Sequence, residues 1–547
     1  MRPLMRFVIL TLAFRMLLGV AAFAQDVPTQ NVDQIFSAYD GQGSPGCSLE
    51  AIRDGAFVYR KAYGLANLEL GVPLSPQSVF YMGSVSKQFT AASVVLAAEQ
   101  GYLSLDDDVR KYIPELPDYG HAITLRQMIH QTSGLRDFFT LLHLSGHDVA
   151  DFNSPEDILK IVVRQKGLNN IPGDEWIYSN TNYFLLGIVV KRATKKSLAQ
   201  FAAENIFHPL GMSHTLFYDD HTLVVPGRVA AYDSGEHDTF RLDWSTTYEV
   251  VGGGGLMSTV DDLLLWDRNF YANRLGKGAL TKELQTPGVL NNGNTISYAM
   301  GLDLGNYRGL PIVEHNGALF GYRTDLLRFP EQKFSVICLC NVASAVPENL
   351  ARKVVDLYLA DKVQPGPSAL EPSGTGNLPD PATFAGKYLD PLTCLMYTFT
   401  ASNGNLMAWG AVLRRISANQ FYDLGSNILT FESSKATMYA KLEIKGETYF
   451  SGSRIQEIHP GEPALASYTG QFRSTELDTA YGLSLEKDTL TLRSHDNPPQ
   501  KLAPIAKDEF DAGDLGRIVF ERDSGRRVFG FRVFTQDARG IAFKKED

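Results

Sequence analysis

Hydrophobic and polar positions divide the chain into a mixed first part and a β-rich second part. From Val32 to Lys362, short alternating runs predict strands and longer apolar runs predict helices. The strand-like runs are CSLEAIRDGAFVYRKAYG, with a hairpin signal at Asp54-Gly55, and later LPIVEHNG, GYRTDLLRFP and FSVICLCN. Helical runs such as SNTNYFLLGIVVKRAT lie between them, and ENLARKVVDLYLADK follows the last strand. This order predicts an α/β domain whose antiparallel sheet, built from both ends, is flanked by helices and interrupted by a helical insertion.

A stretch rich in proline and glycine, residues 364–381, ends the first part and is predicted to be a linker. Beyond it the sequence repeats itself. FAGKY at 384–388 returns as YTGQF at 468–472, and NQFYDLGSNILTFE at 419–432 returns as DEFDAGDLGRIVFE at 508–521. The repeats predict two small, antiparallel, barrel-like β units, at 382–460 and 464–547. Neither carries a catalytic pattern.

The N-terminus reads as an export signal. MRPLMRFVILTLAFRMLLGVAAFAQ has a basic start, an apolar stretch and small residues at Ala22 and Ala24 before Gln25. We expect residues 1–24 to be a cleaved signal peptide and the mature protein to be periplasmic or secreted. An uncleaved anchor is the alternative, although Arg15 interrupts the apolar run and argues against a permanent span. No later segment is long and apolar enough to cross a bilayer.

Composition narrows the class of protein. Hydrophobic residues make up 44% and charged residues 20% of the 547, which is typical of a globular protein. The net charge of −10 argues against nucleic acid as a partner, because phosphate binding needs clustered cations. The four cysteines match no metal-ligand spacing and are few for a disulfide scaffold. Cys338 and Cys340 share one face of a predicted strand, and we expect them to be buried there as small hydrophobic side chains. We therefore expect the stability of the fold to come from its hydrophobic core.

Candidate chemistry begins in FYMGSVSKQFTAASVVLAAEQG, residues 80–101, which predicts a buried helix that stops at Gly101. Ser84 and Lys87 lie three residues apart, on one face of this helix. Burial lowers the pKa of a lysine, so Lys87 could accept the proton of Ser84. The alternative is a helix-start serine beside a lysine whose ammonium reaches solvent.

Two further segments offer the groups that such chemistry needs. WIYSNTNYFLLG places Tyr178 and Asn180 at the head of a helix. VEHNGALFGY places His315 and Gly317 at the end of a strand, where small residues let a substrate approach backbone N–H groups. The alternative interpretations are a helix cap and a structural histidine.

Each pattern occurs a second time, so spacing alone is not specific. The second copies are Ser484-x-x-Lys487 in a predicted surface hairpin, Tyr271-x-Asn273 in a polar helix and His459-x-Gly461 at the boundary between the repeats. Only the first copies have a buried helix, a helix-capping loop and a strand end around them.

The three patterns together resemble the signature motifs of the penicillin-recognising serine hydrolases, the family of class C β-lactamases, D-alanyl-D-alanine carboxypeptidases, D-aminopeptidases and related esterases. MIHQTSGL, HPLGMSHT and GGGGLMSTVDDLLLWD are similar to other landmarks of this family. The resemblance implies a β-lactamase/transpeptidase-like domain at 25–363. The β-rich tail is similar to the barrel domains that follow the catalytic domain in D-aminopeptidases.

Carried over by position, the resemblance implies a role for each residue. Ser84 would be the acylated nucleophile, Lys87 its buried partner and Tyr178 a proton shuttle. Asn180 would hold the substrate amide, and the backbone N–H groups of Ser84 and Ala318 would form the oxyanion hole. Whether Lys87 or Tyr178 takes the serine proton stays open, because both have an ordinary pKa of about 10 and would titrate as a pair.

Two positions depart from the family pattern. His315 stands where β-lactamases of this branch carry a lysine, and imidazole holds a substrate carboxylate less firmly at pH 7. This favours the peptidase and esterase branches over an efficient β-lactamase. The family also offers a glutamine or asparagine after its SGL segment to hold the acyl amide, and RDFFTLL has no match for it.

The expected function is an exported serine hydrolase that forms an acyl-enzyme and acts on peptide or amide bonds of D-amino acids, without cofactor or metal. A metal site at His143 and His147 is not expected, since HLSGH has no acidic ligand nearby. β-Lactams are expected as substrates or inhibitors. The alternatives are a carboxylesterase, a weak β-lactamase, or a non-catalytic penicillin-binding sensor. An α/β-hydrolase is excluded, because no Gly-x-Ser-x-Gly occurs. Oligomeric state stays open.

Overall fold

The computed structural model describes residues 29–546, apart from gaps at 42, 148–153, 236–238, 244–246, 366–377, 409–410, 423–426, 436, 445–446, 457, 459–460 and 495–497. The predicted signal peptide and most of the predicted linker therefore lie outside the described residues. Among the helices of the described part, none combines the length and apolar character that crossing a bilayer requires.

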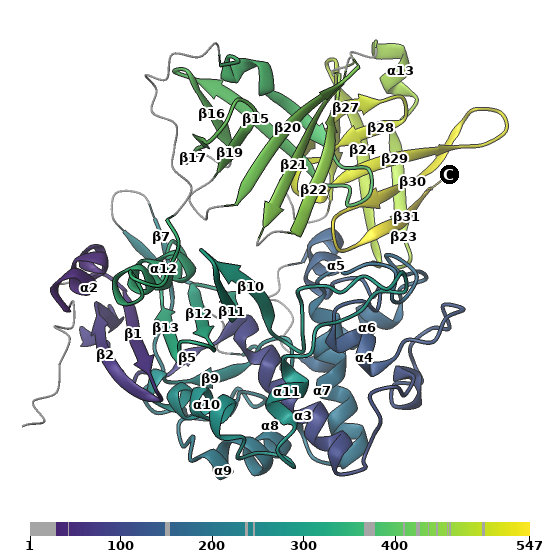
Figure 1. The fold of residues 1–547 in the computed structure, drawn as a ribbon. Coiled ribbons are helices and arrows are strands. Elements are labelled where there is room, and N and C mark those ends of the chain that lie inside the picture. Colours follow the sequence, from purple (N-terminus) through teal and green to yellow (C-terminus); the bar gives the residue numbers. More distant parts are fainter. Residues whose placement is uncertain are drawn as a thin grey trace, which may run out of the picture.

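A six-stranded antiparallel sheet forms the centre of the first part (Figure 1). Its order is β10-β11-β12-β13-β1-β2, so strands from both ends of the segment meet at β13 and β1, as predicted. Asp54 and Gly55 have φ angles of 51° and 72° and form the expected hairpin turn. The strands are β1 (Cys47–Arg53), β2 (Ala56–Tyr63), β10 (Asp303–Tyr307), β11 (Leu310–Leu319), β12 (Tyr322–Phe329) and β13 (Phe334–Cys340).

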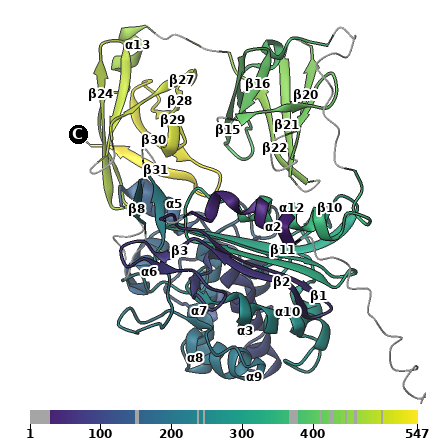
Figure 2. The ribbon, with the colours of Figure 1, turned by 90° about the vertical axis from the view of Figure 1, so that its left-hand side faces the viewer.

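Helices cover both faces of this sheet (Figure 2). α2 (Thr29–Ile35) and α12 (Pro347–Tyr358) pack on one face, where Val32, Leu350 and Val354 join the core of β1 and β13. α3 (Ser86–Glu99) and α10 (Val260–Ala272) lie beneath the other face. α3 is buried along almost its whole length, because it lies between the sheet and the helical insertion.

The helical insertion, predicted from the order of elements, lies beside the sheet (Figure 1). Its helices are α4 (Leu125–Ile129), α5 (Phe138–Ser145), α6 (Pro155–Val163), α7 (Asn180–Thr194), α8 (Leu198–Ala202) and α9 (His208–Leu210), and α11 (Leu280–Leu284) follows α10. The first domain also contains short strands outside the central sheet: β3 (Leu65–Asn67), β4 (Val72–Pro73), β5 (Phe80–Tyr81), β6 (Leu216–Phe217), β7 (Tyr232–Ser234), β8 (Phe240–Leu242) and β9 (Leu256–Ser258).

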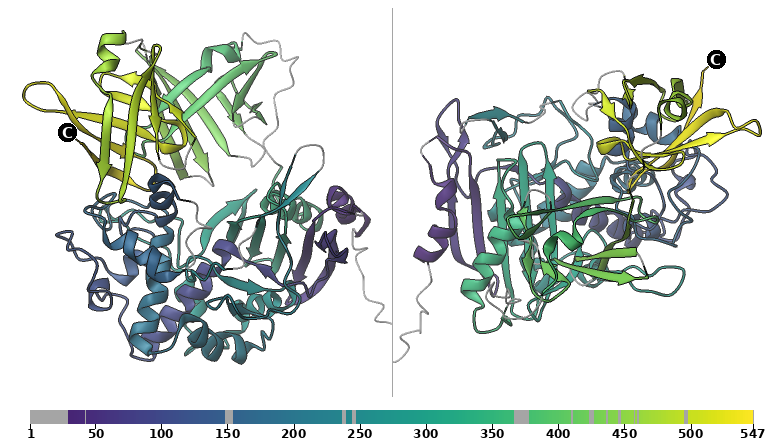
Figure 3. Two further views of the ribbon diagram at one scale, coloured as in Figure 1. Left: turned by 180° about the vertical axis from the view of Figure 1, so that it is seen from behind. Right: turned by 90° about the horizontal axis from the view of Figure 1, so that it is seen from above.

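The C-terminal part contains two nine-stranded antiparallel sheets that stand side by side above the first domain (Figure 3). The first has the order β17-β16-β15-β14-β22-β21-β20-β19-β18 and the second β26-β25-β24-β23-β31-β30-β29-β28-β27. Each order is the other shifted by nine strands, so both are the same up-and-down sheet, nearly closed into a barrel. This confirms the two barrel-like units predicted from the repeats.

The strands of the first sheet are β14 (Gly386–Leu389), β15 (Met396–Ser402), β16 (Asn405–Ala408), β17 (Ala411–Val412), β18 (Arg414–Arg415), β19 (Gln420–Tyr422), β20 (Ile428–Ser434), β21 (Thr437–Ile444) and β22 (Glu447–Arg454). α13 (Glu462–Ala466) precedes the second sheet. Its strands are β23 (Gly470–Ser474), β24 (Thr479–Glu486), β25 (Thr489–Arg493), β26 (Gln500–Lys501), β27 (Ala503–Ala506), β28 (Glu509–Asp511), β29 (Arg517–Arg522), β30 (Val528–Phe534) and β31 (Arg539–Lys545).

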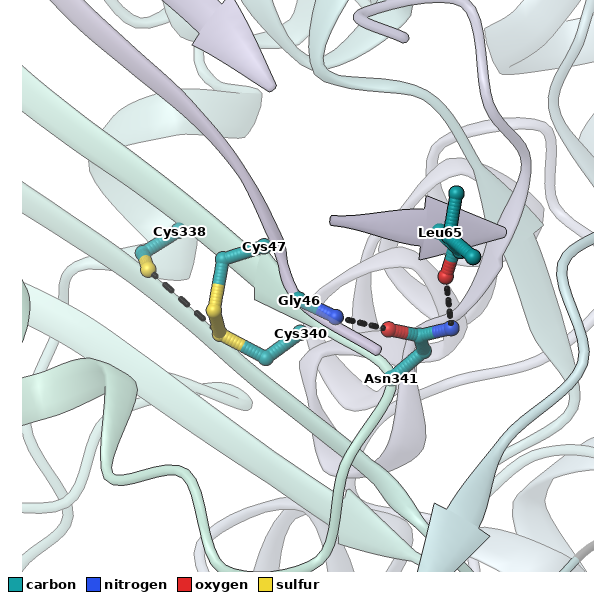
Figure 4. The surroundings of a disulfide bond; sticks show 6 residues. All are labelled: Gly46, Cys47, Leu65, Cys338, Cys340 and Asn341. Atoms are coloured by element: carbon teal, nitrogen blue, oxygen red, sulfur yellow. Dashed lines mark hydrogen bonds between the residues drawn. A yellow bond between two sulfur atoms is a disulfide. The ribbon is translucent and has the colours of Figure 1, made fainter. Parts of the chain in front are cut away.

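A disulfide joins the ends of the first domain, contrary to the expectation that its strand cysteines are only small hydrophobes (Figure 4). Cys47 on β1 is bonded to Cys340 on β13, its partner in the strand register. Cys338 remains a buried thiol, 3.8 Å from the sulfur of Cys340. The prediction was wrong for Cys340 because only the pairing of β1 with β13 brings together residues 293 apart in sequence.

Candidate active site

Ser84 lies in a tight turn pressed against the strand that carries the His-x-Gly pattern. The turn, Gly83–Val85, leads directly into α3. Gly83 has a φ of +52°, and a Cβ there would lie 2.7 Å from the backbone nitrogen of Ala318. A Cβ on Gly317 would lie 2.9 Å from the backbone nitrogen of Ser84. Both glycines are therefore required for the close approach that brings the N–H groups of Ser84 and Ala318 near each other.

Lys87, one turn along α3, is fully buried beneath Ser84. Its Nζ lies 2.9 Å from Ser84 Oγ, 2.7 Å from Asn180 Oδ1 and 2.7 Å from the carbonyl oxygen of Gly253. Burial lowers the pKa of Lys87 to about 7, against the smaller opposite effect of the negative charge of Asp137. A lysine of this pKa exchanges a proton readily near neutral pH.

Tyr178 and Asn180 come from the loop before α7 and from its first residue. The Tyr178 hydroxyl is hydrogen-bonded to Ser84, and its ring centre lies 4.8 Å from Lys87 Nζ. Burial raises the pKa of Tyr178 well above its usual value, so the phenol is neutral. Ser84 thus lies between a lysine and a tyrosine, and for both residues burial favours the uncharged form.

His315 is buried on β11 and closes the site on the sheet side. Its Nδ1 lies 2.7 Å from the carbonyl oxygen of Asn316, which can only accept a hydrogen bond, so this nitrogen carries a proton. Its Nε2 lies 3.3 Å from the hydroxyl of Tyr298. The rings of Tyr178 and His315 are 6.3 Å apart.

Asp137 is a residue of this site that the sequence interpretation missed. It caps α5, accepting hydrogen bonds from the backbone N–H groups of Phe139 and Thr140 at 2.9 and 3.3 Å. Its other carboxylate oxygen accepts from the backbone N–H of Asn180 and, at 2.9 Å, from the side-chain amide of Asn180. Burial raises the pKa of Asp137, and these hydrogen bonds oppose the rise. An aspartate directly before a helical run is a signal for a helix cap, but the local sequence does not indicate that Asp137 also binds Asn180.

These groups surround one cavity of about 450 Å³. Six of the seven residues singled out from the sequence line it, and Lys87 reaches it through its hydrogen bond to Ser84. The rest of the wall is mostly aromatic or aliphatic: Tyr81, Phe138, Phe139, Trp176, Tyr248, Val250, Tyr298 and Leu319. Such a wall suits a substrate with an apolar side chain.

The second copies of the motifs do not line this cavity where the structure describes them. Ser484 lies on β24 of the second C-terminal sheet, and Lys487 in the turn that follows. Tyr271 and Asn273 lie at the end of α10. His459 lies outside the described residues. The predicted structural setting of each motif, rather than its spacing, distinguished the first copies from the second copies.

The second C-terminal sheet docks on the helical insertion, next to α5 (Figure 1). Arg136 Nη1 lies 2.6 Å from Glu476 Oε2, and both side chains are about 5% exposed. The backbone N–H of Asp137 donates to the carbonyl oxygen of Asp537 at 2.9 Å. Arg539 pairs with Glu175 at 3.0 Å. The neighbours of Phe138 and Trp176, two residues of the cavity wall, are therefore held by the C-terminal sheet.

Comparisons with known sequences and structures find related proteins. The sequence profile of the β-lactamase family matches residues 32–360. The D-aminopeptidase of Gluconobacter oxydans is 26% identical over 440 residues, 80% of this chain and 81% of that one. Penicillin-binding protein 4* of Bacillus subtilis is 31% identical over 310 residues, 53% of this chain and 67% of that one. The octameric penicillin-binding protein homologue from Pyrococcus abyssi shares the fold, with a TM-score of 0.56, 20% identity, and coverage of 86% of this chain and 98% of that one.

Proposed function

The chain belongs to the β-lactamase family of serine hydrolases, and on that premise we propose that it hydrolyses amide or peptide bonds of D-amino acids through an acyl-enzyme on Ser84. The observation that carries the proposal is the buried amino group of Lys87, 2.9 Å from Ser84 Oγ, with a pKa lowered to about 7. The D-aminopeptidase relative supports the substrate class.

Acylation would proceed by general-base catalysis. Lys87 takes the proton of Ser84 as Oγ attacks the carbonyl carbon. The backbone N–H groups of Ser84 and Ala318 stabilise the oxyanion, with Gly317 leaving room for the substrate. When the amide bond breaks, Tyr178 gives its proton to the leaving nitrogen and is reprotonated by the ammonium of Lys87. Water then attacks the ester of Ser84 and releases the acid.

The electrostatics favour Lys87 over Tyr178 as the base. Burial lowers the pKa of Lys87 to about 7 and raises that of Tyr178. A neutral lysine beside a neutral phenol avoids both charges in a site that water cannot solvate well. The other assignment needs a phenolate beside a charged ammonium, which must pay two desolvation costs.

Asn180 and His315 are assigned to substrate positioning. Asn180 holds Lys87 through its Oδ1, and its amide faces the same cavity. His315 donates through Nδ1 to a backbone carbonyl and leaves only Nε2 toward Tyr298. An imidazole so engaged is a weaker partner for a substrate carboxylate than a lysine would be, which argues against efficient carboxypeptidase or β-lactamase action.

Export is part of the proposal. The basic and apolar pattern of residues 1–24 supports it. The disulfide between Cys47 and Cys340 supports it as well, because such bonds persist mainly in oxidising compartments. Detection of a mature chain that begins at Gln25 in the periplasm or medium would test this directly.

The deciding experiment is a mass time course of the intact protein with a penicillin and with D-phenylalanine p-nitroanilide. We expect a penicilloyl adduct and release of nitroaniline from the wild type, and neither from Ser84→Ala. The matched control is Ser484→Ala, which removes the serine of the second Ser-x-x-Lys copy and should behave as wild type. An adduct that survives in Ser84→Ala would contradict the assignment of the nucleophile. No adduct and no turnover in any form would favour a non-catalytic protein.

A further inference from the structure

One carboxylate lines the catalytic cavity. Among the described residues of its wall, Asp303 is the only acid, and no arginine or lysine is present apart from Lys87 beneath the serine. Burial is the main cause that raises the pKa of Tyr178, and the negative charge of Asp303 adds to the rise. The charge of Asp303 therefore acts on Tyr178, which is hydrogen-bonded to Ser84.

Asp303 is set beside aromatic rings by a local backbone pairing. It begins β10 and forms an isolated antiparallel bridge with Tyr298. Directly opposed residues in such a bridge project their side chains to the same side. The ring of Tyr298 lies 6.0 Å from that of Trp176 and 6.3 Å from that of Tyr178. All four residues line the cavity, so a carboxylate and three ring systems share one corner of it.

A carboxylate combined with aromatic faces is chemistry that binds an ammonium ion. The carboxylate supplies charge-assisted hydrogen bonds, and the ring faces attract a cation without competing donors. A substrate carboxylate in the same corner would be repelled by Asp303, and His315 offers it no fixed positive charge. The corner therefore discriminates between the two charged ends of a peptide.

We propose that Asp303, together with the rings of Trp176 and Tyr298, binds the free α-ammonium group of the substrate. The residue that acylates Ser84 is then the amino-terminal residue of the substrate, and the enzyme is an aminopeptidase or amino acid amidase rather than a carboxypeptidase. The inference rests on the proposed function, since it assigns the substrate end that occupies the same cavity.

The test compares D-phenylalanine p-nitroanilide with its N-acetyl derivative, which differs only in this group, and adds p-nitrophenyl acetate as a neutral ester that lacks the group altogether. We expect the wild type to prefer the free amine over the acetylated form by roughly 10- to 100-fold in kcat/KM, the value of a hydrogen-bonded charge. Asp303→Asn should remove most of this preference by slowing only the free amine. The neutral ester should be slowed by Asp303→Asn far less than the free amine, because it has no ammonium group to lose. Glu331→Gln, which removes an exposed acid from the turn between β12 and β13, is the control and should keep the preference.

Equal rates for the free and acetylated amides in the wild type would overturn the inference without any variant. The inference would also be overturned if folded Asp303→Asn lost as much activity on the ester as on the free amine. Either result would leave acylation of Ser84 standing. Failure of all three substrates and of the penicillin adduct would overturn the proposed function and this inference with it.

Discussion

The backbone N–H of Asp137 donates to the carbonyl oxygen of Asp537 at 2.9 Å. The first residue caps a helix of the catalytic domain, and the second lies in the last hairpin of the chain, between β30 and β31. The carboxylate of Asp137 holds Asn180, and Asn180 holds Lys87 at 2.7 Å. A short chain of hydrogen bonds thus connects the C-terminal sheet to the lysine beside Ser84.

Replacing Asp137 should therefore change the chemistry and not only the fold. Asp137→Asn removes a negative charge that raises the pKa of Lys87, so that pKa should fall further. The acid limb of the kcat/KM profile should move to lower pH. kcat should drop because an amide keeps only one acceptor oxygen, so either the helix cap or Asn180 loses its acceptor. The matched control is Ser154→Ala, which removes the cap of α6 at a cost of about 1 kcal/mol. A profile that shifts equally in both variants would contradict the positioning role of Asp137.

The lowered pKa of Lys87 predicts the pH dependence of the enzyme. In the proposed mechanism Lys87 must be neutral to accept the serine proton, so kcat/KM for a neutral ester should rise as pH increases through about 7 and then level. Lys87→Arg places a permanent cation there and should lower kcat/KM by roughly 10²- to 10⁴-fold. A stopped-flow pH series measures both. An acid limb near the ordinary lysine pKa would contradict the lowered pKa of Lys87.

Two ion pairs at the interface between the second sheet and the catalytic domain differ in burial and can be compared directly. Arg136–Glu476 is buried, whereas Arg164–Asp478 is 40% and 72% exposed. Arg136→Ala leaves a buried carboxylate without its partner and should lower the free energy of unfolding by about 3–5 kcal/mol. Arg164→Ala should cost at most about 1 kcal/mol. Chemical denaturation measures both, and equal losses would show that burial does not decide the difference.

The disulfide should stabilise the catalytic domain against unfolding. Cys47→Ser opens a link between residues 293 apart and should cost about 2–5 kcal/mol. A reducing agent should lower the melting temperature of the wild type and leave that of a Cys47→Ser, Cys340→Ser double variant unchanged. A wild type that melts at the same temperature with and without reductant would show that the bond does not support the fold.

Local pattern accounts for much of the architecture. The turn at Asp54-Gly55 needs positive φ at two positions, which these residues tolerate, so the first hairpin was predictable. The repeat of FAGKY as YTGQF marks buried aromatics that form equivalent contacts: the ring centres of Phe384 and Phe431 are 4.8 Å apart, and those of Tyr468 and Phe520 are 4.6 Å apart. Side chains that fill equivalent core positions recur in the sequence, and for this reason the two similar C-terminal sheets could be predicted from it.

By itself, then, the sequence determined the elements, the doubled β unit and the residues that surround Ser84, because each depends on local periodicity, turn chemistry or a short motif. Only the tertiary structure decided which distant partners these residues meet. The second acceptor role of Asp137, the pairing of Cys47 with Cys340 and the place of Asp303 beside Tyr178 all depend on contacts between segments far apart in the chain. The pKa of Lys87 belongs to the same class, because burial is a property of the packed molecule and not of the lysine.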